Sequence, residues 1–185
     1  MSKVALSGNA SGTGTFTIAS PNSNTDRVLT LPDATGTILT TATPGVPVNG
    51  PAFSASIASG QAIANNTAVK INFTTENFDT NNNFASSRFT PTVAGYYQVN
   101  LAVALDGSVA GATNSVLIYK NGASLIRSWT AVASGNYSGS TISAIIYLNG
   151  STDYIEAYCF QNTGLTLNTL TGDSSGFSAA MIRSA

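Results

Sequence analysis

The clearest pattern in the sequence is an alternation of large apolar residues with polar or small ones between positions 97 and 105. A period of two is typical of a β-strand with one buried face. The expected buried set is Tyr97, Val99, Leu101, Val103 and Leu105. Pro91 and Gly95 come just before this run and indicate a turn, because proline cannot donate a ladder hydrogen bond and glycine accepts a tight bend.

Shorter alternating runs continue between residues 53 and 182, separated by turn residues. Asn121-Gly122 suits the positive φ angles of a two-residue hairpin and predicts a turn between strands at 115–120 and 123–129. A second pair, Asn149-Gly150, predicts a hairpin between strands at 140–148 and 153–160. The sequence has no helical periodicity of useful length. About eight to ten short strands therefore predict an all-β sandwich or barrel.

The first fifty residues have a different composition. Three short strand-like pieces, at 15–18, 27–31 and 36–40, are separated by turn residues. They carry too few large apolar side chains to close a core alone, but three copies wound about an axis could do so. We therefore predict a β-rich stem at 1–40, a proline- and glycine-containing linker at 41–50, and a head at 51–185.

The low number of charged residues limits the classes of function that the sequence allows. Charged residues make up 8% of the 185 residues, against roughly 25% in typical proteins. The 7 basic and 8 acidic side chains form no run, so we expect no binding to nucleic acid. No segment approaches the roughly 20 apolar residues that span a bilayer, so we expect no membrane insertion and a protein made soluble in the cytoplasm, without an export signal. Many strands with few charges favour aggregation unless closure or oligomerisation covers the sheet edges.

Candidate catalytic groups are scarce. The sequence has no histidine, which removes the usual general base and histidine metal sites. Asp153 and Glu156 are three apart on an expected strand, so they point to opposite faces and cannot act as a pair. Asp79 and the asparagines at 81–83 offer oxygen ligands but lack the spacing of a calcium loop. Cys159 lies in an alternating run and is expected to be buried packing. We therefore predict no enzyme activity, no cofactor and no metal site.

Four short motifs carry a resemblance to a known family. They are Pro51-Ala52-Phe53-Ser54-Ala55, Arg88-Phe89-Thr90-Pro91 with Ala94-Gly95-Tyr96-Tyr97, Lys120-Asn121-Gly122, and Ser175-Gly176-Phe177-Ser178-Ala179. In this order they resemble the globular heads of complement C1q, which are relatives of tumour necrosis factor. The resemblance covers residues 51–185 and implies a ten-strand jelly-roll sandwich assembled as a homotrimer. The candidates for trimer or core packing are Phe53, Tyr96, Tyr97, Val99, Leu101 and Phe177.

The stem also resembles a known module. Phe16-Thr17-Ile18, Leu29-Thr30-Leu31-Pro32-Asp33 and Gly36-Thr37-Ile38-Leu39-Thr40 are similar to a module common in tailed-phage fibre and appendage proteins, where it often lies ahead of a receptor-binding tip. This resemblance implies a virion protein that contacts other virion proteins through its N-terminal segment. The alternative is a plain β-meander of some other extracellular protein.

Two aromatic residues are candidates for receptor binding. Trp129 and Tyr137 flank a loop of mostly small residues, and such rings could stack on a sugar or on a protein surface. The alternative is that Trp129 packs beneath the loop. We expect a trimeric phage fibre or appendage that binds a host surface glycan or protein. A capsid decoration or head-fibre protein, a polysaccharide depolymerase, and a bacterial surface or spore-coat protein are the alternatives.

Overall fold

The structure is a computed structural model, and it describes residues 11–15, 17, 19, 22–26, 28, 50–133 and 135–185. The chain divides into two units, Met1–Thr37 and Ile38–Ala185. The stem and linker predicted at 1–40 and 41–50 lie mostly outside the described residues. No helix in the described ranges is long and apolar enough to cross a membrane.

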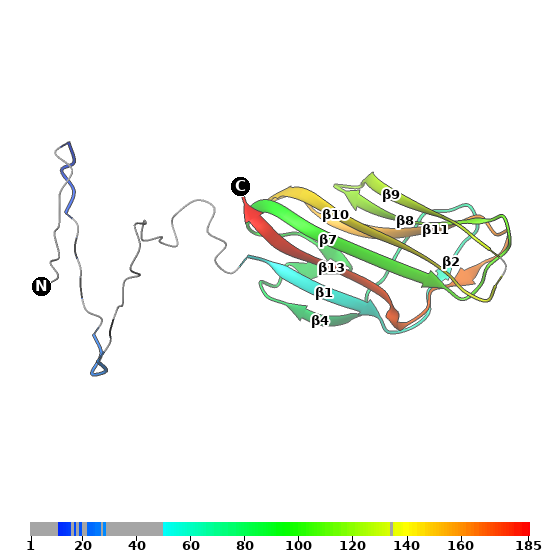
Figure 1. The fold of residues 1–185 in the computed structure, drawn as a ribbon, viewed down its shortest axis with the longest axis horizontal. Helices are drawn as coiled ribbons and strands as arrows, with labels where there is room; N and C mark the ends of the chain where they lie inside the picture. The colour runs from blue at the N-terminus through cyan, green and yellow to red at the C-terminus, as the bar shows by residue number, and fades with distance from the viewer. Residues whose placement is uncertain are drawn as a thin grey trace, which may run out of the picture. The chain divides into compact units, whose positions relative to one another are not determined.

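The head is built from strands alone in its described part. They are β1 (Ala52–Ile57), β2 (Ala62–Ile63), β3 (Val69–Lys70), β4 (Thr75–Asp79), β5 (Phe84–Ala85), β6 (Arg88–Phe89), β7 (Ala94–Leu105), β8 (Thr113–Lys120), β9 (Ala123–Ala131), β10 (Ser138–Asn149), β11 (Ile155–Gln161), β12 (Leu167–Asn168) and β13 (Gly172–Ser184). Two antiparallel sheets form, in the orders β10-β7-β13-β1-β4 and β5-β6-β11-β8-β9. β3 adds to β11, and β2 pairs with β12. Figure 1 shows the first of these sheets in front, with β8, β9 and β11 behind it.

The core lies between the inner faces of the two sheets. β7 buries alternate residues from Gly95 to Leu105, which is the face expected from the period of two. An aromatic cluster fills the space beside it: the Phe53 ring stacks on Phe84 and Phe89 at centroid distances of 4.4 and 4.6 Å and meets Phe177 edge-on at 5.0 Å. Burial of these large rings dominates the stability of the sandwich.

The turn at Asn121-Gly122 has the predicted geometry. Both residues have positive φ, 53° for Asn121 and 82° for Gly122, and they join the paired strands β8 and β9. These angles match the right-handed twist of the flanking strands, which explains why asparagine and glycine occupy the turn.

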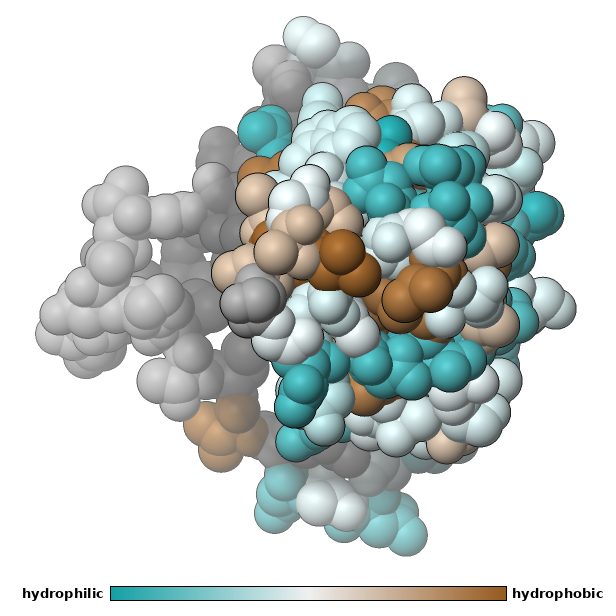
Figure 2. Space-filling model, turned by 90° about the vertical axis from the view of Figure 1, so that its right-hand side faces the viewer, coloured by the Kyte–Doolittle hydropathy of each residue, from teal (hydrophilic) through white to brown (hydrophobic). Residues whose placement is uncertain are grey.

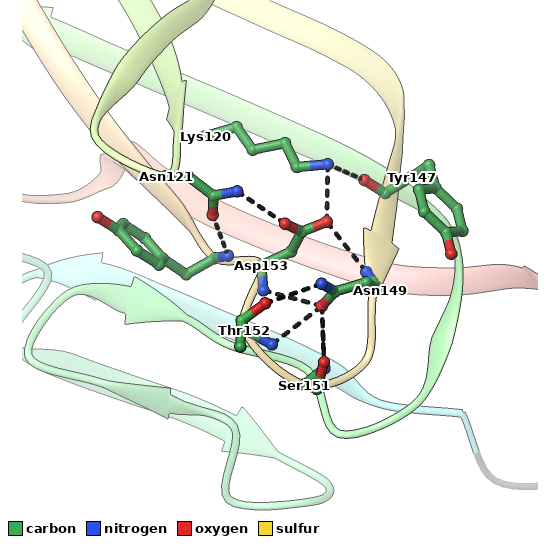
Figure 3. A network of polar contacts seen from close by, with 8 residues as sticks. Lys120, Asn121, Tyr147, Asn149, Ser151, Thr152 and Asp153 are labelled. Atoms are coloured by element: carbon green, nitrogen blue, oxygen red, sulfur yellow. Dashed lines mark hydrogen bonds and ion pairs between the residues drawn. The ribbon is translucent and has the colours of Figure 1, made fainter.

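The predicted hairpin at Asn149-Gly150 is wrong. β10 pairs with β7 along twelve residues, whereas β11 pairs with β8 in the other sheet, so this segment crosses between the sheets. Only Gly150 has positive φ there, at 70°. Oδ1 of Asn149 accepts hydrogen bonds from the backbone N–H groups of Ser151, Thr152 and Asp153 and thereby closes the crossing turn, as Figure 3 shows.

Candidate functional site

Five of the six packing candidates lie in the core. Phe53, Tyr97, Val99, Leu101 and Phe177 are all buried. The Tyr97 hydroxyl donates to the carbonyl oxygen of Val93 at 2.6 Å, and burial raises the pKa of Tyr97 to about 12. These residues are therefore unable to contact another subunit without unfolding of the head.

Tyr96 differs from the other five because it points away from the core. It is exposed, and its ring lies 5.5 Å from that of Tyr147 on the neighbouring strand β10. Tyr96 and Tyr147 are direct partners in the β7–β10 register, and Ile145 follows on the same face opposite Gln98. Ile182 of β13 lines a groove of about 510 Å³ with Tyr96, Ile145 and Arg183, at the end of the sheet where the chain terminates. We call these four residues, Tyr96, Ile145, Tyr147 and Ile182, the apolar patch.

The charges of this sheet lie on β4 and β13: Arg183 lines the groove beside Tyr96, and Asp173 lines a hollow with Asn100 and Ser143. β1, β7 and β10 contain no charged residue. Beyond the apolar patch, small and amide side chains cross the face: Gln98 donates to Ser143 Oγ at 2.9 Å, and Ser143 donates to Asn100 Oδ1 at 2.9 Å. The exposed apolar side chains on the uncharged strands β7 and β10 resemble the centre of a protein interface, where charged residues are depleted.

The two receptor candidates lie apart from the apolar patch. Trp129, on β9, is 59% exposed and projects from the outer face of the second sheet, so it does not pack beneath the loop. Tyr137 is 68% exposed and precedes β10. The ring contacts of the described residues join Trp129 to Phe160 rather than to Tyr137, so the two candidates do not form one stack.

Figure 2 faces the end of the head at which β7 ends, and it shows hydrophobic side chains gathered among polar ones. Val109, in the loop after β7, and Leu165, in the loop before β12, have exposed side chains. The loops of this end are joined by a hydrogen bond from Ser108 to the carbonyl oxygen of Gly135. Trp129 and Tyr137 flank the loop that contains Gly135, so both candidates lie near this end.

The outer face of the second sheet also carries charge. Glu156 is almost fully buried, and its Oε1 accepts from Lys70 Nζ at 2.8 Å and from Arg88 Nε at 2.9 Å. Burial opposes ionisation of Glu156, but these two cations outweigh it and hold the pKa of the carboxyl below its usual range. The arrangement orders β3, β6 and β11 without offering a reactive group.

The described residues show no group of three or more acidic, cysteine or histidine side chains that could hold a metal ion. Asp153 and Glu156 each hold structural ion pairs with lysine or arginine. Cys159 is buried, and burial raises the pKa of its thiol to about 12. What the described surface offers is contact area: a sheet face with an apolar patch, and an aromatic and cationic face on the opposite sheet.

Comparisons with known proteins agree with this architecture. The sequence matches no family model and no curated protein. Among solved structures, the globular domain of zebrafish complement 1qA protein matches with a TM-score of 0.54 at 16% identity, covering 74% of this chain and 99% of that one. Eiger, a tumour necrosis factor of S. frugiperda, matches with a TM-score of 0.57 at 12% identity, covering 77% and 96%. The vertex protein P5 of PRD1 matches with a TM-score of 0.55 at 18% identity, covering 74% and 99%.

These similarities establish the fold class. The head is an all-β jelly-roll sandwich of the complement C1q and tumour necrosis factor type, as the motifs predicted. Each of its two sheets has a main path of five strands. At such low identity a shared fold does not carry a function across.

Proposed function

We propose that this chain is a non-enzymatic virion protein of a tailed phage, a homotrimeric fibre or appendage. Residues 51–185 form the head, residues 41–50 the linker, and residues 1–40 a stem that attaches to other virion proteins. The stem motifs and the similarity of the head to a phage vertex protein support a virion role. The head trimerises and binds a receptor on the host surface.

The observation that carries the proposal is the apolar patch on the outer face of the β10-β7-β13-β1-β4 sheet. Ile145 is 59% exposed, and Tyr96, Tyr147 and Ile182 beside it are also exposed. In a cyclic trimer the outer face of the β10-β7-β13-β1-β4 sheet packs about the threefold axis, so each patch is covered by its neighbours. The second sheet then faces outward, and Trp129 and Tyr137 stay accessible to a host glycan or protein.

A capsid decoration or head-fibre protein with a stabilising role is the second candidate. The PRD1 protein with the similar fold is a vertex protein, which favours a position on the capsid. Such a protein uses the same trimeric head but needs no host receptor.

Light scattering on the full-length chain tests the trimer. We expect a molar mass three times 18.9 kDa for the native sequence and a shift to the monomer for Ile145→Asp, because three carboxylates would then lie near the threefold axis. Leu125→Asp, at a similarly exposed residue of β9 in the other sheet, is the matched control and should stay trimeric. A native monomer, or an Ile145→Asp trimer with unchanged mass, contradicts the proposed assembly.

Gold-labelled antibody on intact virions separates the two candidates. Labelling at the tail supports the fibre or appendage, and labelling over the capsid supports decoration. If mass spectrometry detects the protein in virions but the antibody labels neither tail nor capsid, the epitope is buried in the virion. The experiment is then repeated with virions that carry an exposed tag on this protein. Absence of the protein from purified virions rules out both candidates.

A further inference from the structure

Arg127 occupies an unusual position on the outer face of the second sheet. Its guanidinium carbon lies 3.5 Å from the ring centroid of Trp129 and 4.5 Å from that of Phe160. Its Nε donates to Ser115 Oγ at 3.0 Å. Ser115 is the register partner of Trp129 on β9 and of Phe160 on β11, so three adjacent strands fix the guanidinium in place.

This cation has no counter-ion among the described residues. The ion pairs there use Lys70, Arg88 and Lys120, and none includes Arg127. Its Nη2 atom is buried and has no hydrogen-bond partner in the described part of the chain. Burial lowers the pKa of Arg127, although a guanidinium stays protonated in proteins. A partly dehydrated charge without a counter-ion is unfavourable, and a bound anion would offset that cost.

Trp129 supplies the second half of a recognition surface. Arg127 lies over its ring, yet 59% of the side chain is exposed. Phe160 meets the indole edge-on, with ring centroids 6.3 Å apart, and so limits how the ring can rotate. A rigid, exposed indole offers apolar area at a low entropic cost. It suits a ligand with a flat apolar face, such as the C–H face of a pyranose.

We propose that Arg127, Trp129 and Phe160 form a binding site for an acidic sugar, a pyranose that carries a carboxylate, within a host surface polysaccharide. The carboxylate binds the guanidinium, whose charge is shared by Nη1 and the buried Nη2, and the sugar ring packs against the exposed indole. A protein receptor fits less well, because the surface combines one unpaired cation with a single exposed ring. The inference rests on the proposed receptor-binding role of the head.

Arg88 provides a matched comparison on the same sheet face. Its guanidinium also stacks on an aromatic ring, with the carbon 3.8 Å from the Tyr154 centroid. Unlike Arg127, it is paired with Glu156. If any surface arginine attracted the ligand through long-range charge, removal of either residue would have the same effect. If the site is local, only removal of Arg127 weakens binding.

Trp129 is the only tryptophan in the chain, so its fluorescence reports directly on this site. The probes are hexagalacturonate and sialyllactose, with methyl-esterified hexagalacturonate and lactose as neutral counterparts. We expect an acidic probe to change the emission in a saturable way and its neutral counterpart to change it little. Arg127→Gln should weaken binding by about tenfold or more, whereas Arg88→Gln should change it by less than about twofold.

Calorimetry extends the test to variants without the fluorophore. Trp129→Ala should weaken binding by about tenfold, and Arg127→Lys should lose part of the affinity because it keeps the charge but not the planar group. Each variant is first checked for its native circular dichroism and molar mass. Equal binding of neutral probes, equal loss in Arg88→Gln and Arg127→Gln, or no emission change with either acidic probe would overturn the inference.

A protein receptor has a separate signature. Host cells that lose binding after protease treatment and keep it after periodate oxidation of their sugars would exclude the acidic-sugar site as the receptor contact. The trimer is measured independently by light scattering. A trimer that does not bind the acidic sugars therefore overturns this inference alone, whereas a native monomer overturns the proposed function.

Discussion

The ammonium of Lys120 lies 2.8 Å from Oδ2 of Asp153, and this ion pair joins the end of β8 to the turn that carries the chain from β10 to β11. Lys120 also donates to the carbonyl oxygen of Tyr147, and Oδ1 of Asp153 accepts from Asn121 Nδ2 at 2.7 Å (Figure 3). Asp153 therefore connects the hairpin turn of one sheet to the strand end of the other. It is nearly buried, so its acceptors are not replaced easily by water.

Asp153→Asn should destabilise the head. The variant loses the charge that pairs with Lys120. It also replaces one acceptor oxygen by an amide NH2 group, which would face the N–H donors of Lys120 or Asn121. We expect a loss of about 2 kcal/mol in the free energy of unfolding, measured by urea denaturation at a fixed chain concentration. Asp173→Asn, at an exposed aspartate, is the control and should change stability by less than about 0.5 kcal/mol. Equal midpoints for the two variants would contradict a structural role for Asp153.

Stability should fall in acid. Hydrogen bonds from Lys120 and Asn121 hold the pKa of Asp153 below its usual range, and Lys70 and Arg88 do the same for the buried Glu156. A carboxyl whose pKa is lower in the folded state stabilises that state above its unfolded pKa, about 4, and loses this contribution as pH falls through the folded value. The urea midpoint should therefore drop between pH 5 and pH 2 in about this window. In Asp153→Asn the urea midpoint should depend less steeply on pH. A urea midpoint of the native protein that does not change with pH would contradict the prediction.

Two glycines with positive φ should respond differently to alanine. A Cβ at Gly150, where φ is 70°, would lie 2.2 Å from the backbone nitrogen of Ala94. At Gly164, where φ is 85°, nothing lies within 4 Å. Gly164→Ala should cost only the left-handed backbone penalty of about 1–2 kcal/mol. Gly150→Ala adds a clash with another strand and should cost at least about 3 kcal/mol or prevent folding. Thermal or urea unfolding of both variants measures the difference, and similar losses would show that the clash is relieved.

The thiol of Cys159 should be inert in the folded protein. It is fully buried in β11, and burial raises its pKa to about 12, so little thiolate is present at neutral pH. Ellman's reagent at pH 8 should label the native protein at least about 100-fold more slowly than protein in guanidinium chloride. Because the chain has one cysteine, the reaction reports on this position alone. Rapid labelling without denaturant would show that β11 opens readily.

Local sequence was informative where a few neighbouring residues decide the structure. The alternation in β7 and the turn at Asn121-Gly122 follow from side-chain direction and backbone preference, and both were predicted correctly. Asn149-Gly150 has the same two residues but a different structure, because its flanking strands belong to different sheets. A dipeptide favours a turn but does not specify which strands pair beyond it.

The candidate site was predicted only in part. Trp129 and Tyr137 are exposed, but they do not stack on each other. Arg127 was missed, although its place two residues before Trp129 on an expected strand puts both on one face. Phe160 could not be assigned to this site from local pattern, because it comes from β11 and reaches the site only through the pairing of β11 with β8. Tyr96 was grouped with the candidates for trimer or core packing, and its parity opposite to Tyr97 was the signal that it lies outside the core.

The sequence by itself determined which residues of each strand share a face and where several turns form, because side chains alternate along a strand and glycine, proline and asparagine restrict the backbone locally. Tertiary structure decided which strands are neighbours, which faces close the core, and which side chains from distant strands meet around Arg127 and at the apolar patch. Those outcomes depend on the register of long-range pairs and on the packing of two sheets. Neither is encoded in a short stretch of chain.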